Sequence, residues 1–489
     1  MVVNYFANLG YFVPELIVIG TMLAMLFLEA SYKNEDKGRG LVFSIASVGL
    51  ILSFFTLLNN LSDEPLAIFT NAVVIDQFST FAKIIMVLGT FGSIYLSSQS
   101  NDIYSDFKSE FAIMSMGVLV GGMLLASANN MLTLYLGIET LSILSYVLAS
   151  LRKNDDYSSE AGLKYSLYGG IAAGVMLFGM SHIFGVLGTI QFEEIIPKLQ
   201  NLSSLQLSIL IPSFMMFFVG IGYKIACVPF HMWAPDVYEG SPIPVTTFFS
   251  IVPKVAGIAA LVRITMVFFS KEGALQDSWI IILQVIAVLT MFVGNISAID
   301  QRSVKRMLAY SSIAHAGFML LGVVVMDAVG ARAILFYAAL YLFMTLSAFY
   351  ITSFVSDKYG NDHFERFNGM YVRYPLIAIM MGITMFSLSG LPPFGGFVAK
   401  FNILKAAIDR GYYTLATLGA INSVISLYYY LKIVRNMIFT PPESEEEIEG
   451  FSFKNTAIII GLTSPVVIFG LFWGGLMLMA TNAKLFILQ

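Results

Sequence analysis

The chain has 489 residues, of which 57% are hydrophobic and only 12% are charged, and its net charge is −4. Soluble domains carry about 25% charged residues, so the composition indicates an integral membrane protein, and the small net charge gives no reason to expect a polyanionic partner. A single cysteine excludes a disulfide framework and a cysteine-ligated metal cluster. The histidines are scattered and no glycine-rich nucleotide motif is present, which excludes soluble redox and nucleotide chemistry in this chain.

Apolar runs of about 20 residues predict transmembrane helices. The sequence contains fourteen such runs, which predicts an all-α polytopic membrane protein. The first run is expected to be retained as a span, because it lacks a positive n-region and a small-residue cleavage site. The expected spans are 11–30, 41–59, 76–97, 110–127, 130–151, 160–187, 205–230, 243–269, 278–298, 305–325, 330–355, 373–408, 412–434 and 455–482.

Lysine and arginine residues in the loops predict the orientation of the chain. Loops after odd-numbered spans carry 15 of them, whereas loops after even-numbered spans, together with the C-terminus, carry 5. This asymmetry predicts that the odd loops are cytoplasmic and that both termini lie outside, on the periplasmic side of a bacterial inner membrane. The remaining seven basic residues fall inside expected spans: Lys83, Lys164, Lys224, Lys254, Arg263, Lys400 and Lys405.

The seventh expected span is interrupted by prolines. The stretch 217–257 holds Lys224 and Lys254 in sequence that is otherwise apolar enough to cross a bilayer. A charge at the membrane centre costs roughly 2.5–3.5 kcal/mol on insertion scales, and each proline removes a backbone donor where no water replaces it. Because both costs occur in one segment, we predict that the buried lysines and the helix break have a function. The prolines of this first break are Pro229, Pro235, Pro242 and Pro244.

A second break lies in the twelfth span, where Pro392 and Pro393 precede Lys400. The broken spans are five apart, which predicts two five-helix repeats, helices 4–8 and 9–13. An odd repeat length inverts the second copy, the arrangement in which transporter sites form at broken helices near the midplane. The expected division is three N-terminal helices (1–109), the two repeats (110–269 and 270–438), and a segment with an acidic loop and the last helix (439–489).

Glu139 is interpreted as the one carboxylate deep inside a span. It is either a structural acid held by hydroxyls such as Thr133 or Ser142, or a proton-relay or gating carboxylate whose charge is held by a lysine. Lys164, on the next expected helix, is the candidate partner. An opposite charge keeps each group ionised despite desolvation, and separating the two changes the proton affinity of both.

Burial disfavours the charged form of a lysine, so a row of buried lysines can pass protons through intervening water. Lys224, Lys254 and Lys400 are the candidates for this row. The other three basic residues near span ends (Lys83, Arg263 and Lys405) are expected to reach the membrane interface along their flexible stems.

Two histidines are possible members of the relay. His231 directly follows the first break, and His315 lies in the tenth expected span with hydroxyl residues one turn before it. Each is read either as a hydrogen-bonded structural residue or as a proton carrier. The many methionines and phenylalanines are expected to pack helices and face lipid.

Five segments together resemble a known family: LYLGIETLSILSYVL, EAGLKYSLYGG, VPFHMWAPDVYEGSP, SVKRMLAYSSIAHAGF and SLSGLPPFGGFVAKF. They are similar to the subunit N family of bacterial NADH-quinone oxidoreductase (respiratory complex I), one of its antiporter-like subunits. The resemblance extends through most of the chain. The GFVAK run departs slightly from the family's more common glycine before the lysine.

The resemblance implies a fourteen-helix fold with inverted repeats and a role in proton translocation coupled to quinone reduction. It implies that no redox cofactor binds to this chain, since NADH, flavin, iron–sulfur clusters and quinone belong to other subunits. The expected partners are the neighbouring membrane-arm subunits and the bilayer, with no nucleic acid and no metal. The implied proton-translocation residues are Glu139, Lys164, Lys224, Lys254 and Lys400.

Two alternatives remain open at this point. The wider family includes subunits of multi-subunit sodium/proton antiporters, which would need neither NADH nor quinone. A third reading is a non-pumping structural subunit of the membrane arm that has inherited the lysines.

Overall fold

The computed structural model of the chain describes residues 8–32, 36–61, 64–269, 274–442 and 452–486. Within this part, twelve helices are long and apolar enough to cross a membrane, and they correspond to twelve of the fourteen expected spans. The twelfth expected span forms two short helices, and the thirteenth forms a long helix outside these twelve. The chain is a helical, multi-pass membrane protein.

The first half of the chain contains the β-hairpin and the first break. A short hairpin of two antiparallel strands, β1 (Leu66–Ile68) and β2 (Val73–Ile75), lies between α3 and α4. The helices are α2 (Val13–Tyr32), α3 (Asp36–Asn60), α4 (Gln77–Gln99), α5 (Lys108–Ala126), α6 (Met131–Ala149), α7 (Asp156–Leu187), α8 (Phe192–Lys198), α9 (Ser204–Ile225), α10 (Trp233–Gly240) and α11 (Ile243–Phe268).

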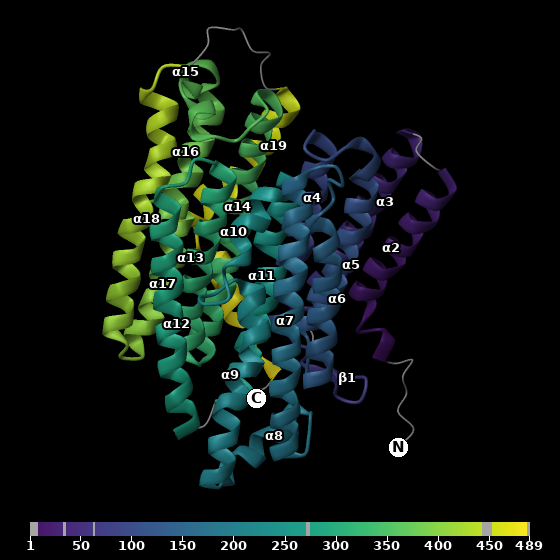
Figure 1. Ribbon diagram of the computed structural model, residues 1–489, viewed down its shortest axis with the longest axis vertical. Helices are drawn as coiled ribbons and strands as arrows, with labels where there is room; N and C mark the ends of the chain where they lie inside the picture. Colours follow the sequence, from purple (N-terminus) through teal and green to yellow (C-terminus); the bar gives the residue numbers. More distant parts are fainter. Residues whose placement is uncertain (1–7, 33–35, 62–63, 270–273, 443–451, 487–489) are drawn as a thin grey trace.

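The second half continues the bundle on the other side of α11, as the green and yellow ribbons show (Figure 1). Its break separates α16 from α17. The helices are α12 (Ala274–Ile299), α13 (Val304–Val325), α14 (Ala328–Tyr359), α15 (Met370–Arg373), α16 (Pro375–Ser389), α17 (Gly395–Asp409), α18 (Tyr413–Phe439), α19 (Phe453–Leu471) and α20 (Gly474–Asn482).

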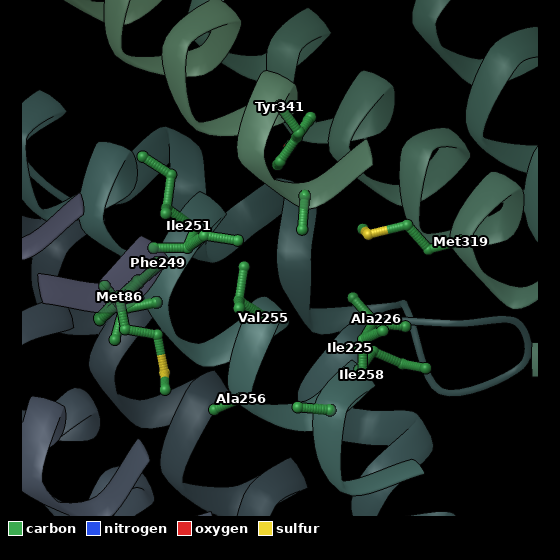
Figure 2. Packing of buried hydrophobic residues seen from close by; sticks show 14 of the residues in the cluster. Met86, Ile225, Ala226, Phe249, Ile251, Val255, Ala256, Ile258, Met319 and Tyr341 are labelled. Atoms are coloured by element: carbon green, nitrogen blue, oxygen red, sulfur yellow. The ribbon is translucent and has the colours of Figure 1, made fainter. Parts of the chain in front are cut away.

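Helix α11 lies at the centre of the bundle, and all of its residues are buried. A helix that is apolar on every face is stable only when neighbours surround it. Figure 2 shows Val255 of α11 in the middle, with Met86 of α4, Met319 of α13 and Tyr341 of α14 around it. Lys254 is next to Val255 on this buried helix, so it lies in the interior of the bundle.

Helices α5 and α6 approach closely where both carry glycine. A β-carbon on Gly121 would lie 2.6 Å from the backbone nitrogen of Leu141, and one on Gly137 would lie 2.9 Å from the backbone of Leu125. Small residues allow membrane helices to pack backbone to backbone. This contact fixes the α6 turn that carries Glu139.

The last described residues are held at one end of the bundle. They lie, like the beginning of α2, towards the lower end in Figure 1. The backbone nitrogen of Phe486 donates to an Asp76 carboxylate oxygen at 3.0 Å, and that of Phe78 donates to the Lys484 carbonyl at 3.2 Å. These bonds attach the last described residues to the start of α4. The acidic run expected at 444–449 lies outside the described residues.

Candidate proton-translocation site

The first helix break places Lys224 at the penultimate position of α9. Ala226 adopts a left-handed φ of 57°, and the Val228–Pro229 bond is cis. Because proline has no backbone N–H, helical hydrogen bonding stops here. Pro235, predicted as a further break, instead lies in the first turn of α10, where proline is tolerated.

Lys224 is buried in an aromatic cage. Its Nζ lies 5.2 Å from the ring centre of Tyr165, 5.6 Å from that of Tyr223 and 5.7 Å from that of Tyr146. Among the described side chains, this ammonium has no hydrogen-bond acceptor. Trp233 of α10 fixes the cage, since it stacks on Tyr165 at 4.3 Å and donates to the Tyr223 carbonyl at 3.0 Å. The cage tolerates a cation without neutralising it.

Glu139 is half-buried on α6, and one of its carboxylate oxygens is enclosed without a hydrogen-bond partner in the described part of the chain. Lys224 is the cation that acts electrostatically on it. The hydroxyl of Ser142 donates instead to the Ile138 carbonyl at 2.5 Å. The expected pairing with Lys164 was therefore wrong, and neither Thr133 nor Ser142 donates a hydrogen bond to the enclosed oxygen, as the structural reading required.

Lys164 pairs with Asp236 at 2.5 Å and with Glu160 at 2.6 Å, and its side chain is 35% exposed. The pairing follows from the first break, which turns α10 back against α7. Arg306 of α13 contacts the other oxygen of Asp236 at 3.1 Å and also pairs with Glu239. Two carboxylates of α10 thus bind cations from both halves of the chain.

Lys254 continues the series inside the bundle. It is 1% exposed, and its Nζ donates to the Ser312 hydroxyl of α13 at 2.7 Å. The ring of Tyr238 lies 5.8 Å away. A hydroxyl partner solvates the ammonium but leaves its charge uncompensated, and a hydroxyl can also pass a proton onward.

His315 lies one turn beyond Ser312 on α13 and is 2% exposed. Its Nδ1 is 2.5 Å from the Tyr337 hydroxyl and its Nε2 is 3.1 Å from the Tyr430 hydroxyl. Lys254 and Lys400 both act electrostatically on the ring. His315 therefore lies within electrostatic reach of both lysines, while its two ring nitrogens contact tyrosine hydroxyls.

The second break positions Lys400 on α17. Gly390 takes a φ of 87° after α16, and the Pro392–Pro393 bond is cis. Lys400 is buried; its Nζ donates to the Ser389 carbonyl at 3.0 Å and lies 4.6 Å from the Phe318 ring centre. Ser389 is the last residue of α16, so the lysine binds at the partially negative end of a helix.

The sequence of the chain matches a known protein family. The family described as NADH:quinone oxidoreductase/Mrp antiporter, TM, matches residues 128–426, which is more than half of the chain. The chain belongs to this family. The matched range contains the five charged residues and both helix breaks.

Curated relatives of the family cover nearly the whole chain. NADH-quinone oxidoreductase subunit N 2 of Sorangium cellulosum is 38% identical, over 96% of this chain and 96% of that protein. NADH-quinone oxidoreductase subunit N of Trichlorobacter lovleyi is 37% identical, over 91% of this chain and 90% of its own length. The chloroplastic NAD(P)H-quinone oxidoreductase subunit 2 of Mesostigma viride is 36% identical, over 92% and 89%.

Solved structures have the same fold. A chain of respiratory complex I from Thermus thermophilus with bound aureothin superposes with a TM-score of 0.81 at 28% identity, covering 96% of this chain and 100% of that one. A chain of the Mrp complex from Dietzia sp. has a TM-score of 0.84 at 20% identity, with 97% of each chain covered. The second likeness shows the fold alone.

Two basic residues expected at the membrane interface are buried in ion pairs. Lys83 pairs with Glu15 at 2.6 Å, and Arg263 pairs with Asp76 at 3.0 Å, with every side chain at most 1% exposed. The snorkelling prediction was wrong for both, because neighbouring helices cover these span ends. Glu15, which sequence reasoning missed, is also a fully buried span carboxylate. Lys405 is 57% exposed and pairs with Asp409 at 2.6 Å, and its position at the membrane interface stays a prediction.

His231 is not joined to the series. It is partly buried in the break after α9, and its Nδ1 has no partner among the described residues. Its backbone carbonyl accepts from Ala234 at the start of α10 at 3.0 Å. This contact involves only the backbone, so both readings of the His231 side chain stay predictions.

Proposed function

We propose that the chain is a proton-translocating membrane subunit of an NADH:quinone oxidoreductase, acting as part of that H+-translocating enzyme. Its partners are the other membrane-arm subunits, and its redox groups (NADH, flavin, iron–sulfur clusters and quinone) are bound by other chains. The names of its relatives support the assignment. The chain lies in a bacterial inner membrane with both termini on the outer side, as the distribution of basic residues favours.

One observation carries the proposal: buried ionisable groups follow one another across the interior of the bundle. Glu139 acts electrostatically on Lys224, and Lys254 bonds Ser312 at 2.7 Å. His315 then lies within electrostatic reach of Lys254 and Lys400. A structural subunit gains nothing from unneutralised charges in hydrocarbon, and intramembrane ionisable residues of this kind mark proton pathways.

The lysines supply sites whose proton affinity changes when a neighbouring charge moves. Lys224, without a hydrogen-bond acceptor in the described chain, is held only by aromatic faces and the charge of Glu139. Loss of that carboxylate charge removes its main electrostatic support and favours release of its proton. In the proposed sequence the proton passes by way of Lys254 and His315 towards Lys400.

The energy required is compatible with such a switch. Moving one charge against 100 mV takes about 2.3 kcal/mol. Bringing together or separating opposite charges in a region of low effective dielectric changes the free energy by several kcal/mol. Quinone reduction elsewhere in the enzyme would supply this energy through the packed helices.

The proposed pathway crosses two repeats, 110–269 and 270–438, with a three-helix segment (1–109) before them and an acidic loop and last helix (439–489) after them. Each repeat contains one broken helix with a buried lysine beside the break. Lys224 precedes its break, whereas Lys400 follows its own. In this division α10 and α13 form one of the contacts between the repeats, through Asp236 and Arg306.

The decisive test is replacement of Lys224 by alanine in the assembled enzyme. NADH oxidation by added quinone and proton uptake into proteoliposomes are measured together. We expect assembly to be retained and the proton-to-electron ratio to fall by this subunit's share. Lys405→Ala, at an exposed lysine, is the matched control. An unchanged ratio in Lys224→Ala would refute the relay.

The family description also includes Mrp antiporters, so a sodium/proton antiporter subunit is the second candidate. It predicts sodium-driven proton movement in vesicles that contain neither NADH nor quinone. Proton movement that requires both substrates favours the oxidoreductase, and isolation of the chain with its native partners identifies the assembly directly.

A further inference from the structure

Two adjoining hollows lie where the end of α20 meets the beginning of α14 and the end of α17. Each has a volume of about 270 Å³, and Arg332 and Thr481 line both. Lys405 completes the first hollow, and Lys484 completes the second. The three cations come from three separate segments, so the fold brings them together at this place.

The hollows carry more positive than negative charge. Lys405 is neutralised by Asp409 at 2.6 Å, and Asp409 is the one acidic residue in either lining. The Nε of Arg332 donates to the Ala328 carbonyl at 3.0 Å, which leaves the forked end of its guanidinium for another acceptor. Among the residues that the structure describes, neither Arg332 nor Lys484 forms an ion pair.

This surplus occurs where basic residues are rare. Of the 27 lysine and arginine residues in the chain, 5 follow even-numbered expected spans or lie at the C-terminus, and the structure places one of them, Arg332, near the beginning of α14. Two of these, Arg332 and Lys484, line the same hollow. Basic residues on that side are usually disfavoured during insertion, so their convergence calls for a bound anion.

The surroundings are apolar and exposed. Val329, Met477 and Leu485 line the hollows beside the charged groups. Leu478 and Phe401, which are next in sequence to Met477 and Asn402 of the lining, are 61% and 53% exposed. A ligand for this place needs an anionic head and an apolar body.

We propose that the hollows bind the phosphate headgroup of an anionic phospholipid, with Arg332 and Lys484 as its main ligands. The planar fork of arginine matches two phosphate oxygens, and the lysine adds a second positive charge. Basic pockets between membrane helices bind anionic headgroups in this way. The acyl chains lie along the exposed apolar residues of α17 and α20. This inference does not depend on the proposed proton pathway.

The test uses the assembled complex, delipidated in mild detergent and titrated with an equimolar mixture of phosphatidylglycerol and phosphatidylcholine. Native mass spectrometry measures the lipid bound to each subunit. We expect phosphatidylglycerol to be retained preferentially, and Arg332→Gln with Lys484→Gln to bind it about tenfold more weakly, because charge-assisted hydrogen bonds are lost. Arg332→Lys with Lys484→Arg keeps both charges and should retain the lipid.

Arg410→Gln is the matched control, since Arg410 is exposed at the same end of the bundle and lines neither hollow. It should bind phosphatidylglycerol as the unaltered chain does. Equal retention of the two lipids, or unchanged binding in the double glutamine variant, overturns the proposal. Displacement of the lipid by millimolar inorganic phosphate also overturns it, because it would indicate a site for the free anion.

Discussion

The Asp236 carboxylate is shared by Lys164 and Arg306, two cations from opposite halves of the chain. One oxygen lies 2.5 Å from Lys164 Nζ on α7, and the other lies 3.1 Å from Arg306 Nη2 on α13. Asp236 belongs to the helix that directly follows the break beside Lys224. The same helix carries Trp233, which holds the aromatic cage. The position of the cage is therefore linked to charges on both halves.

Replacing Asp236 by asparagine tests this link. The change preserves shape but removes the shared negative charge, so α10 should lose its fixed position between α7 and α13. We expect proton pumping to fall while assembly is retained, because each partly exposed ion pair contributes only about 0.2–1 kcal/mol to stability. The ratio of protons taken up to NADH oxidised measures the effect. Glu160→Gln removes the other partner of Lys164 and should leave the ratio unchanged; an equal loss in both variants would contradict a special role for Asp236.

His315→Gln tests the connection between the two repeats. Glutamine can still hydrogen-bond Tyr337 and Tyr430, but it cannot take up a proton. If the imidazole carries the proton, transfer through this subunit should slow by about 10²-fold or more, and the ratio of protons taken up to NADH oxidised should fall by this subunit's share. His182→Gln, at an exposed histidine of α7, is the control and should have no effect. Normal coupled uptake in His315→Gln would assign the histidine a structural role.

Much of this arrangement could be predicted from the sequence, because the relevant signals are local. Prolines beside a charged residue within an apolar run identified the breaks at Lys224 and Lys400. Run length alone located the spans, and twelve of them correspond to long apolar helices. Both signals reflect one constraint. In lipid the backbone must satisfy its own hydrogen bonds, so a helix is interrupted only where protein surrounds the break.

The wrong predictions concerned which side chains form ion pairs. Lys164 was assigned to Glu139 because the two lie on consecutive helices, but the chain folds α10 back to place Asp236 closer. Lys83 and Arg263 lie near span ends, and sequence does not reveal that α2 and α4 cover those ends. Pairing depends on tertiary packing, so hydropathy alone could not supply it.

The buried pair of Arg263 and Asp76 gives a stability prediction. Arg263→Met leaves the Asp76 carboxylate buried without its counter-ion, although it retains bonds from Ser79 and Phe486. Breaking a buried pair from one side costs about 3–5 kcal/mol. The thermal unfolding midpoint of the detergent-solubilised chain should fall clearly. Lys405→Met, at an exposed pair, should cost at most about 1 kcal/mol, and similar midpoints for both variants would show that the Arg263 pair contributes little.

Gly396 tests whether the second break positions Lys400. Its backbone nitrogen donates to the Ser387 hydroxyl at 2.9 Å, and a β-carbon at this position would lie 1.8 Å from the Ser387 carbonyl oxygen. Gly396→Ala must therefore push α17 away from α16, and with it the bond from Lys400 to Ser389. We expect this subunit's share of the coupled proton uptake to be lost although every ionisable residue is still present.

Gly382→Ala provides the matched control, because a β-carbon there meets nothing within 4 Å. Each variant adds one methyl group to one of the two helices that flank the break, and only Gly396→Ala disturbs the lysine. Proton uptake per NADH oxidised, compared at equal amounts of assembled enzyme, separates mispositioning from misfolding. If Gly396→Ala assembles and pumps as Gly382→Ala does, the contact of Lys400 with the end of α16 is not required for proton transfer.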